Sequence, residues 1–354
     1  MRLQQLRDDL TRRDWDDGVD GTVRVAIVGV GHFARTAALP AIAESDYCEA
    51  TVLVSGSAEK ARRVADEAGV ERAITYDEYG DGVAADAYDA AYVVTPNALH
   101  LPHVEAAAAR GKAVLCEKPL EATVERAERL VYACEDAGAP LMVAYRTRFD
   151  PVVRRVREFV RGGGVGEPIQ VHGDFTIEVI SDRRGPDQWR LDPDLSGGGA
   201  LMDVGVYPLN AARFLLDADP EAVTGTTSGD GPFADVDEHV AFGVEFPDGV
   251  TGAFTANFSG FRDSRLSILG TEGRIEIERA FDYARPRRVR AELEGARISF
   301  DGPLTDEIRE EFDYFARCLL AGESPGPDGQ DGLNDMRTMA AVYEAAERGE
   351  RVEL

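Results

Sequence analysis

Val23-Arg24-Val25-Ala26-Ile27-Val28-Gly29-Val30-Gly31-His32-Phe33-Ala34 joins a strand-like run directly to the pattern G-x-G-x-x-A. A helix is predicted to follow, from about Arg35 to Glu44. The glycines permit a tight turn and a close backbone approach, and the helix N-terminus then faces a pyrophosphate. Because the pattern lies between a strand and a helix, Gly29, Gly31, His32, Phe33 and Ala34 are predicted to bind a dinucleotide.

The next predicted strand, Glu49 to Val54, bears on the choice of nicotinamide cofactor. An NAD site usually has an acid at the end of this strand, where it binds the ribose 2′-hydroxyl. Here the strand ends in Ser55-Gly56-Ser57, with Lys60 one turn into the following helix. Hydroxyl donors, a helix N-terminus and a cation suit a 2′-phosphate, so this stretch favours NADP. The alternative is that Ser57 only caps the helix and Lys60 is solvated.

Strands and helices continue to alternate, which predicts a doubly wound parallel sheet. The expected strands are 73–75, 90–94, 113–116 and 141–145, with a helix at 124–137. Residues at the carboxyl ends of such strands lie where ligands bind. Thr95-Pro96-Asn97-Ala98-Leu99-His100 follows one of these strands, so Thr95, Pro96, Asn97 and His100 are predicted to face the nicotinamide half. Taken alone, Asn97 or His100 is more typical of a loop hydrogen bond or a helix cap than of a cofactor contact.

The stretch Cys116-Glu117-Lys118-Pro119 ends another strand with an acid, a base and a proline. Lys118 is one of only three lysines among 39 basic residues. Lysine can lose its proton when it is desolvated, whereas arginine effectively cannot. Lys118 is therefore a candidate catalytic cation, and Glu117 is either a ribose ligand or a balancing charge.

The character of the chain changes near Tyr145–Asp150, where a domain boundary is predicted. A helix at 151–161 is followed by strand-like segments at 171–180, 240–246, 251–258, 265–269 and 274–277, with two helices at 305–321 and 333–349. Consecutive strands joined by glycine turns predict an antiparallel sheet. The predicted class is α/β, with a Rossmann domain (23–147) and a C-terminal α+β domain with an open, mostly antiparallel sheet (148–354). Residues 1–22 form an arm that packs on its own domain, reaches a partner subunit or covers the cofactor.

One glycine-led helix interrupts these strands, in the stretch Gly197 to Asn210. Its glycines allow the helix to start close against another backbone. Asp203 and Tyr207 are four residues apart, so both project from one face of a helix. An Asp in a largely apolar helix is costly unless it is satisfied, which makes it a site candidate. The alternative is an Asp that stabilises the helix dipole and a Tyr packed in the core.

The composition limits the partners and the setting of the protein. With 65 acidic against 39 basic residues and a net charge of −26, the surface repels nucleic acid and anionic membranes. Abundant carboxylates with so little lysine indicate a halophilic protein that works in high salt. The four cysteines show no paired spacing and no metal cluster, and no signal peptide or membrane span is visible, so we expect a cytoplasmic protein without a metal.

Six motifs in order resemble one family over nearly the whole chain: GVGHFA, TPNALH, CEKP, YRTRFDP, QWR and GGGALMDVGVYPLN. This is similar to the glucose–fructose oxidoreductase, inositol dehydrogenase and MocA (Gfo/Idh/MocA) family. The family's usual helix has D-x-x-x-H, whereas this chain has Asp203-x-x-x-Tyr207, which resembles the NADP-preferring glucose–fructose oxidoreductase branch. The resemblance implies that Arg146, Trp189 and Arg190 contact the cofactor, and that the site lies between the two domains.

The resemblance further implies NADP-dependent oxidation of an aldopyranose at C1, with D-xylose to D-xylonolactone as the first choice. Tyr207 would act as the base, Lys118 would favour its phenolate, and Asp203 would hold a sugar hydroxyl and help orient Lys118. Alternatives are a related sugar or dihydrodiol oxidoreductase, or an NADP-binding regulator without catalysis. The exposed face of the antiparallel sheet is a plausible pairing surface, so a homodimer or homotetramer is expected.

Overall fold

The computed structural model describes residues 3–181 and 184–354, so residues 1 and 2 of the predicted arm lie outside the described residues. The chain forms two compact units. Residues Asp14–Arg146 and Asp306–Met336 make up one, called here the Rossmann unit. Thr147–Thr305, Arg337–Leu354 and the described residues up to Arg13 make up the other, called the sheet unit.

The Rossmann unit is built on a parallel sheet, in which the described residues contribute six strands in the order β3-β2-β1-β4-β5-β6. The central strands β1, β4 and β5 are mainly apolar and buried, with Arg24 and Glu117 as half-buried exceptions, as expected for a sheet covered on both faces. This confirms the predicted doubly wound fold. The strands are β1 (Val23–Val28), β2 (Cys48–Ser55), β3 (Arg72–Thr75), β4 (Ala90–Val93), β5 (Ala113–Glu117) and β6 (Leu141–Ala144).

The helices of the Rossmann unit begin and end at sequence signals. In α5 (Val124–Ala137) the Thr123 side chain accepts a hydrogen bond from the Arg126 amide, and Gly138 ends the helix in the left-handed region. Its bounds are those predicted. The remaining elements are a π-helical turn η2 (Ala34–Ala38), α1 (Leu39–Ala43), α2 (Ala58–Ala68), α3 (Tyr76–Gly80), η3 (Asn97–Leu99), α4 (His100–Ala108) and α9 (Glu307–Ala321).

The sheet unit contains a sheet to which the described residues contribute nine strands, ordered β14-β13-β12-β11-β7-β10-β9-β8-β15. Of the neighbouring pairs in the part of the chain described, β7 and β10 run parallel and the others antiparallel, which confirms the predicted mostly antiparallel sheet. The strands are β7 (Pro168–Glu178), β8 (Ala222–Ser228), β9 (His239–Glu245), β10 (Thr251–Asn257), β11 (Ser259–Gly270), β12 (Gly273–Glu278), β13 (Arg288–Leu293), β14 (Ala296–Asp301) and β15 (Val352–Glu353).

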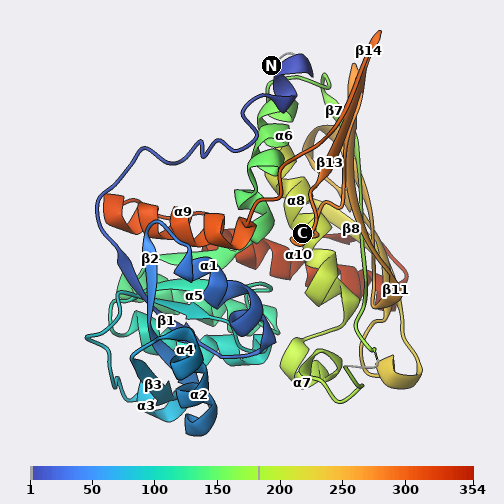
Figure 1. The fold of residues 1–354 in the computed structure, drawn as a ribbon. Helices are drawn as coiled ribbons and strands as arrows, with labels where there is room; N and C mark the ends of the chain where they lie inside the picture. The colour runs from blue at the N-terminus through green and yellow to red at the C-terminus, as the bar shows by residue number, and fades with distance from the viewer. Residues whose placement is uncertain (1–2, 182–183) are drawn as a thin grey trace. The chain divides into compact units, whose positions relative to one another are not determined.

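Helices α6 (Pro151–Arg161) and α8 (Val206–Leu216) cover one face of this sheet (Figure 1). A π-helical turn η6 (Leu201–Gly205) leads directly into α8. The long α10 (Gly329–Arg348) gives its first residues to the Rossmann unit and the rest to the sheet unit. Short elements complete the unit: η1 (Leu3–Arg7), η4 (Arg146–Phe149), η5 (Trp189–Leu191), α7 (Pro193–Ser196), η7 (Gly231–Phe233) and η8 (Pro247–Gly249).

The division of the chain differs from the predicted domains at two places. Helix α9 belongs with the Rossmann strands, because the Phe312 ring lies 5.0 Å from that of Tyr92 and the Phe312 carbonyl accepts from the Cys48 thiol. The first residues of the arm belong instead to the sheet unit, where the Arg155 guanidinium donates to the Gln5 carbonyl at 2.7 Å and Leu6 is fully buried. Neither contact follows a local sequence signal.

Within the described residues, no helix is long and apolar enough to cross a membrane. The same residues hold no group of three or more His, Cys, Asp or Glu side chains placed to bind a metal ion.

Candidate active site

The loop after β1 is shaped by two glycines with different surroundings. Gly29 has φ +106°, and a Cβ there would lie 2.7 Å from the Val94 carbonyl oxygen, so only glycine fits. A Cβ on Gly31 would meet nothing within 4 Å. Ala34 at the end of the pattern is fully buried, while His32 is exposed. The loop thus packs tightly at Gly29 and leaves open space at Gly31, where a dinucleotide-binding loop would hold a pyrophosphate.

The loop after β2 contains the residues predicted to choose NADP. Ser57 caps α2, since its hydroxyl accepts from the Lys60 amide at 3.3 Å. The Ser57 side chain therefore has the capping role that was the alternative interpretation. Gly56 and Ser57 are exposed, Ser55 is buried, and Lys60 is half-buried on the first turn of the helix. An exposed hydroxyl and a lysine beside a helix N-terminus remain compatible with a phosphate ligand.

The loop after β4 contains Thr95, Pro96 and Asn97, which were predicted to face the nicotinamide half of the cofactor. The buried Thr95 hydroxyl has no hydrogen-bond partner among the described residues, and its methyl lies beside Gly29. Asn97 is buried at the start of η3, and Pro96 precedes it. An orphaned hydroxyl beside the glycine loop fits a site that receives a polar ligand.

His100 is a correction to the predicted set of cofactor contacts. Its ring is fully buried, and its nitrogens lie 3.1 Å from the Leu120 carbonyl oxygen and 3.0 Å from that of Thr95. Burial lowers the pKa of His100, which favours the neutral ring. The neutral ring has one N–H, so it donates to one of these two carbonyls and fills the space between the loops after β4 and β5. His100 therefore supports the site from inside and does not face a ligand.

Glu117 and Lys118 end β5 beside a tyrosine that the sequence did not single out. The Tyr92 hydroxyl donates to Glu117 Oε1 at 2.6 Å, and the Lys118 amide donates to Oε2 at 3.2 Å. The Lys118–Pro119 peptide bond is cis, and the Lys118 side chain is half-buried. Glu117 is thus an oriented carboxylate held from both sides. Tyr92 could have been suspected as the only aromatic residue in an Ala/Val strand.

Buried acids on α9 lie near this strand end and were missed at the sequence level. Arg146 forms a buried ion pair with Glu307, and its contact with the cofactor stays a prediction. Glu311, one turn further along α9, is 1% exposed and its Oε1 has no hydrogen-bond partner among the described residues. Burial and the nearby Glu117 charge raise the pKa of Glu311 well above its usual range, against the opposing effect of Arg146. The raised pKa favours the protonated form of Glu311.

The sheet unit brings three predicted residues together. Arg190 Nε donates to Asp203 Oδ2 at 2.9 Å, and its guanidinium lies 4.6 Å from the centre of the Trp189 ring. Within the sheet unit Arg190 binds the Asp203 carboxylate, and the predicted role of Asp203 in orienting Lys118 stays a prediction. Asp203 also lies in the π-helical turn η6, so its spacing to Tyr207 departs from that of a regular α-helix.

Tyr207 is half-buried in an aromatic cluster. Its ring lies 5.3 Å from that of Phe175 on β7 and 5.8 Å from that of Phe281. These contacts fix the ring from two sides. Phe175 alternates with polar residues along a strand, so its burial was predictable, whereas the approach of Phe281 depends on the tertiary fold. Lys118 and Tyr207 belong to different units, and their joint action stays a proposal.

Comparison with known proteins places this geometry in a family. Residues 23–145 match the model described as the oxidoreductase family, NAD-binding Rossmann fold, and residues 153–276 match the GFO/IDH/MocA C-terminal domain. The chain belongs to the Gfo/Idh/MocA oxidoreductase family.

Three relatives of this Gfo/Idh/MocA chain bear on its function. It is 50% identical to a D-xylose 1-dehydrogenase [NADP(+)] of Haloarcula marismortui, over 100% of both chains. It is 36% identical to a D-xylose 1-dehydrogenase (NADP(+)) 2 of Haloferax volcanii, over 93% of this chain and 98% of the other. The crystal structure of an aldose-aldose oxidoreductase from Caulobacter crescentus, complexed with glycerol, matches with a TM-score of 0.88 and 35% identity, over 94% of this chain and 100% of that one.

Proposed function

We propose that this chain oxidises D-xylose at C1 with NADP as the hydride acceptor, producing D-xylonolactone and NADPH. One observation carries the proposal: the chain is 50% identical, over its full length, to an NADP-dependent D-xylose 1-dehydrogenase. A second relative of the same printed activity, at 36% identity, agrees with it.

The Rossmann unit offers a fitting place for the cofactor. The open space at Gly31 would take the pyrophosphate, and the orphaned Thr95 hydroxyl would find a polar partner on the nicotinamide side. Ser57 and Lys60 would hold the 2′-phosphate. When bound, NADP accepts the hydride that leaves C1 of the sugar.

The remaining chemistry is the removal of a proton from the C1 hydroxyl. In our proposal the Tyr207 oxygen takes this proton, and the Lys118 ammonium stabilises the negative charge that develops on the tyrosine and on the sugar oxygen. Asp203, which Arg190 orients, accepts a hydrogen bond from a sugar hydroxyl. The Phe175 and Phe281 rings hold Tyr207 in a defined direction.

The proposal is tested by a panel of sugars with NADP or NAD in molar salt, followed by NADPH or NADH absorbance. We expect the highest kcat/KM for D-xylose with NADP, lower values for D-glucose, and weak activity with NAD. Turnover of D-glucose above that of D-xylose would contradict the assignment of the substrate.

A second candidate is supported by the likeness to the aldose-aldose oxidoreductase. In such a reaction the reduced cofactor would be reoxidised by a second aldose, so NADPH would not accumulate. Free NADPH formed in a one-to-one ratio with lactone supports the dehydrogenase. Lactone formed together with a sugar alcohol, without free NADPH, supports the second candidate.

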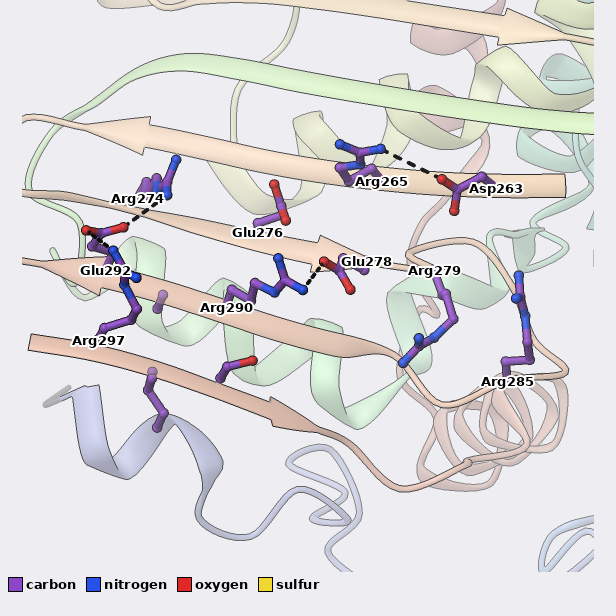
Figure 2. Close-up of a pocket in the computed structure, with 13 residues that line it drawn as sticks. Asp263, Arg265, Arg274, Glu276, Glu278, Arg279, Arg285, Arg290, Glu292 and Arg297 are labelled. Atoms are coloured by element: carbon purple, nitrogen blue, oxygen red, sulfur yellow. Dashed lines mark hydrogen bonds and ion pairs between the residues drawn. The ribbon is translucent and has the colours of Figure 1, made fainter. Parts of the chain in front are cut away.

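We further propose that the protein forms a homodimer or homotetramer through the open face of the sheet. Along β11 to β14, arginines and acidic residues together line a hollow of about 710 Å³ (Figure 2). Arg290 pairs with Glu278 at 2.8 Å, and Arg274 and Arg297 both pair with Glu292. Because this face carries charges of both signs, a second copy related by a two-fold axis can place arginine against glutamate.

The test of this surface is the mass of the protein in molar salt by analytical ultracentrifugation. We expect a dimer or tetramer for the natural chain and a smaller species for the double variant Arg274→Glu/Arg290→Glu. The matched control is Arg63→Glu/Arg72→Glu on the Rossmann unit, which makes the same charge change. Equal masses for all three proteins would exclude this face as the interface.

A further inference from the structure

The helix that carries Asp203 and Tyr207 is held at its start by one distant residue, Asp237. The Asp237 carboxylate accepts from the Gly199 amide (Oδ1) and the Leu201 amide (Oδ2), both at 2.7 Å. Its backbone carbonyl accepts from the Ala200 amide at 2.8 Å. The first amides of a helix have no partner inside the helix. Asp237 therefore satisfies three successive amides of this helix start.

Tyr343 on α10 completes this arrangement. Its hydroxyl donates to Asp237 Oδ1 at 2.6 Å, and Asp237 is only 7% exposed. Burial raises the pKa of Tyr343, which keeps its hydroxyl protonated and able to donate. We call Asp237 and Tyr343 together the helix clamp.

The glycines before the helix are explained by the helix clamp. A Cβ on Gly198 would lie 2.2 Å from the Tyr343 hydroxyl, and one on Gly199 would lie 2.0 Å from the Asp237 carbonyl oxygen. Larger residues at these positions would push the clamp away from the helix. The sequence pattern thus requires a close contact here, as predicted from the glycines.

The helix clamp acts on the same residue that begins the π-helical turn. The Leu201 amide is bound by Asp237, and the Leu201 carbonyl accepts from the Val206 amide, five residues on. If this turn closed as an ordinary α-helix, the helix register would change by one residue, which corresponds to a rotation of about 100°. The direction in which Tyr207 points therefore depends on how Leu201 is held.

We propose that Asp237 and Tyr343 are positioning residues for the reaction, because they fix the winding of the turn between Leu201 and Tyr207. The inference rests on the proposed function, in which Tyr207 is the base. Neither residue contacts the reacting atoms in this proposal. Their effect reaches the substrate through the orientation of Asp203 and Tyr207.

The test compares Tyr343→Phe and Asp237→Asn with a matched control, Asp150→Asn. Asp150 is 1% exposed, accepts from the Val152 and Val153 amides at the start of α6, and binds Arg287 at 2.6 Å. It therefore caps a helix of the same unit in the same way, but α6 carries none of the candidate site residues. Tyr343→Phe keeps the ring, so it decides the question if Asp237→Asn fails to fold.

Two readouts are needed. In the first, kcat and its pH profile are normalised to the number of sites that bind NADPH. We expect both clamp variants to lose at least ~10-fold in kcat, with a shifted pH profile and an unchanged dissociation constant for NADPH. Asp150→Asn is expected to lower Tm while its kcat per site and pH profile stay as in the natural protein.

In the second readout, amide hydrogen exchange is measured over residues 197–210 without substrate. We expect faster exchange in the clamp variants than in Asp150→Asn, and this result supports the clamp. If the natural protein oxidises no sugar in the panel, only the proposed function is overturned, and the exchange result still tests the clamp. Exchange equal to that of the control would overturn the clamp. Normal kcat and pH profile in Tyr343→Phe, beside an active natural protein, would also overturn it.

Discussion

Tyr207 is the residue on which the proposed chemistry depends most directly. Replacing it with Phe keeps the ring between Phe175 and Phe281 but removes the group that accepts the proton. We expect kcat to fall by roughly 10²–10⁴-fold, the usual contribution of general-base catalysis. The dissociation constant for NADPH is expected to stay unchanged, since the cofactor loops lie in the other unit. Turnover at the natural rate would exclude Tyr207 as the base.

Lys60 tests the choice of NADP. A hydrogen bond to a charged group contributes about 1.5–3 kcal/mol, so Lys60→Ala is expected to weaken NADPH at least ~10-fold and NADH hardly at all. Arg63→Ala is the control, because Arg63 lies on the same helix but pairs with Glu67 at 4.0 Å. Titration by NADPH fluorescence measures both. Equal weakening of NADPH and NADH would show that Lys60 does not contact a 2′-phosphate.

The raised pKa of Glu311 predicts how the stability of the fold changes with pH. Its pKa in the folded chain is raised, so the folded state holds a proton that the unfolded state releases above about 4.3. Stability is therefore lost as pH rises from that value toward the folded pKa. Gln cannot ionise, so Glu311→Gln is expected to raise Tm at neutral pH and to change it little near pH ~4.

The control for Glu311 lies on the same helix. Asp313 Oδ1 accepts from the Ser45 hydroxyl at 2.5 Å and from the Asp46 amide at 2.9 Å, so Asp313→Asn is expected to lower Tm at neutral pH. A Glu311→Gln variant whose Tm differs from that of the natural protein by the same amount at every pH would contradict a buried, protonated Glu311.

At the scale of elements, the loop after β1 gives a paired prediction. A Cβ on Gly31 meets nothing within 4 Å, so Gly31→Ala is expected to keep the Tm of the natural protein. The same Cβ enters the space proposed for the pyrophosphate, so NADPH binding is expected to be lost. Gly29→Ala is expected to lower Tm instead, because its Cβ would lie 2.7 Å from the Val94 carbonyl oxygen at φ +106°. Unimpaired NADPH binding by Gly31→Ala would contradict this placement.

For helices α5 and α6, where capping residues mark both ends in the sequence, the first and last residues were predicted correctly. Helix α6 runs from Pro151 to Arg161 as expected, because Asp150 caps it and Pro151 occupies its first turn. Strands β13 and β14 were not predicted, although Val289 and Ala291 alternate with charged residues. Their outward arginines and glutamates resemble a polar loop until the partner strands are known. Strand β8 was missed for the same reason, since its residues are mostly Thr, Ser and Gly.

The candidate site was predictable where it follows strand ends and not where it depends on distant residues. The loops at Gly29, Thr95 and Glu117 lie at the ends of β1, β4 and β5, as the fold requires. The partners of Arg146 and Asp203 were not predictable. Arg146 meets Glu307 from a helix that follows the second sheet, and Asp203 meets Arg190 across an irregular loop. Such pairs join residues that are far apart in the sequence and meet only in the tertiary fold, and no local sequence pattern predicts them.

At the scale of the whole molecule, the net charge of −26 predicts a dependence on salt. Surface ion pairs such as Arg24–Asp89 and Arg351–Glu245 contribute little, and salt screens them. The excess carboxylates repel one another over the whole surface. The screening length of this repulsion falls from about 10 Å at 0.1 M to about 3 Å at 1 M salt. We therefore expect Tm to rise steeply as KCl is increased from low concentration to about 1 M.

The origin of this stabilisation can be separated by the choice of solute. Sucrose stabilises folded proteins by exclusion from their surface and leaves charge repulsion unscreened. If repulsion dominates, KCl raises Tm well above the value reached in sucrose of equal osmolality, and most of the gain occurs while the screening length is still shrinking. A Tm that falls with KCl would mean that attractive ion pairs outweigh repulsion, and a constant Tm would mean that the two balance, because screening weakens both and the larger effect sets the sign.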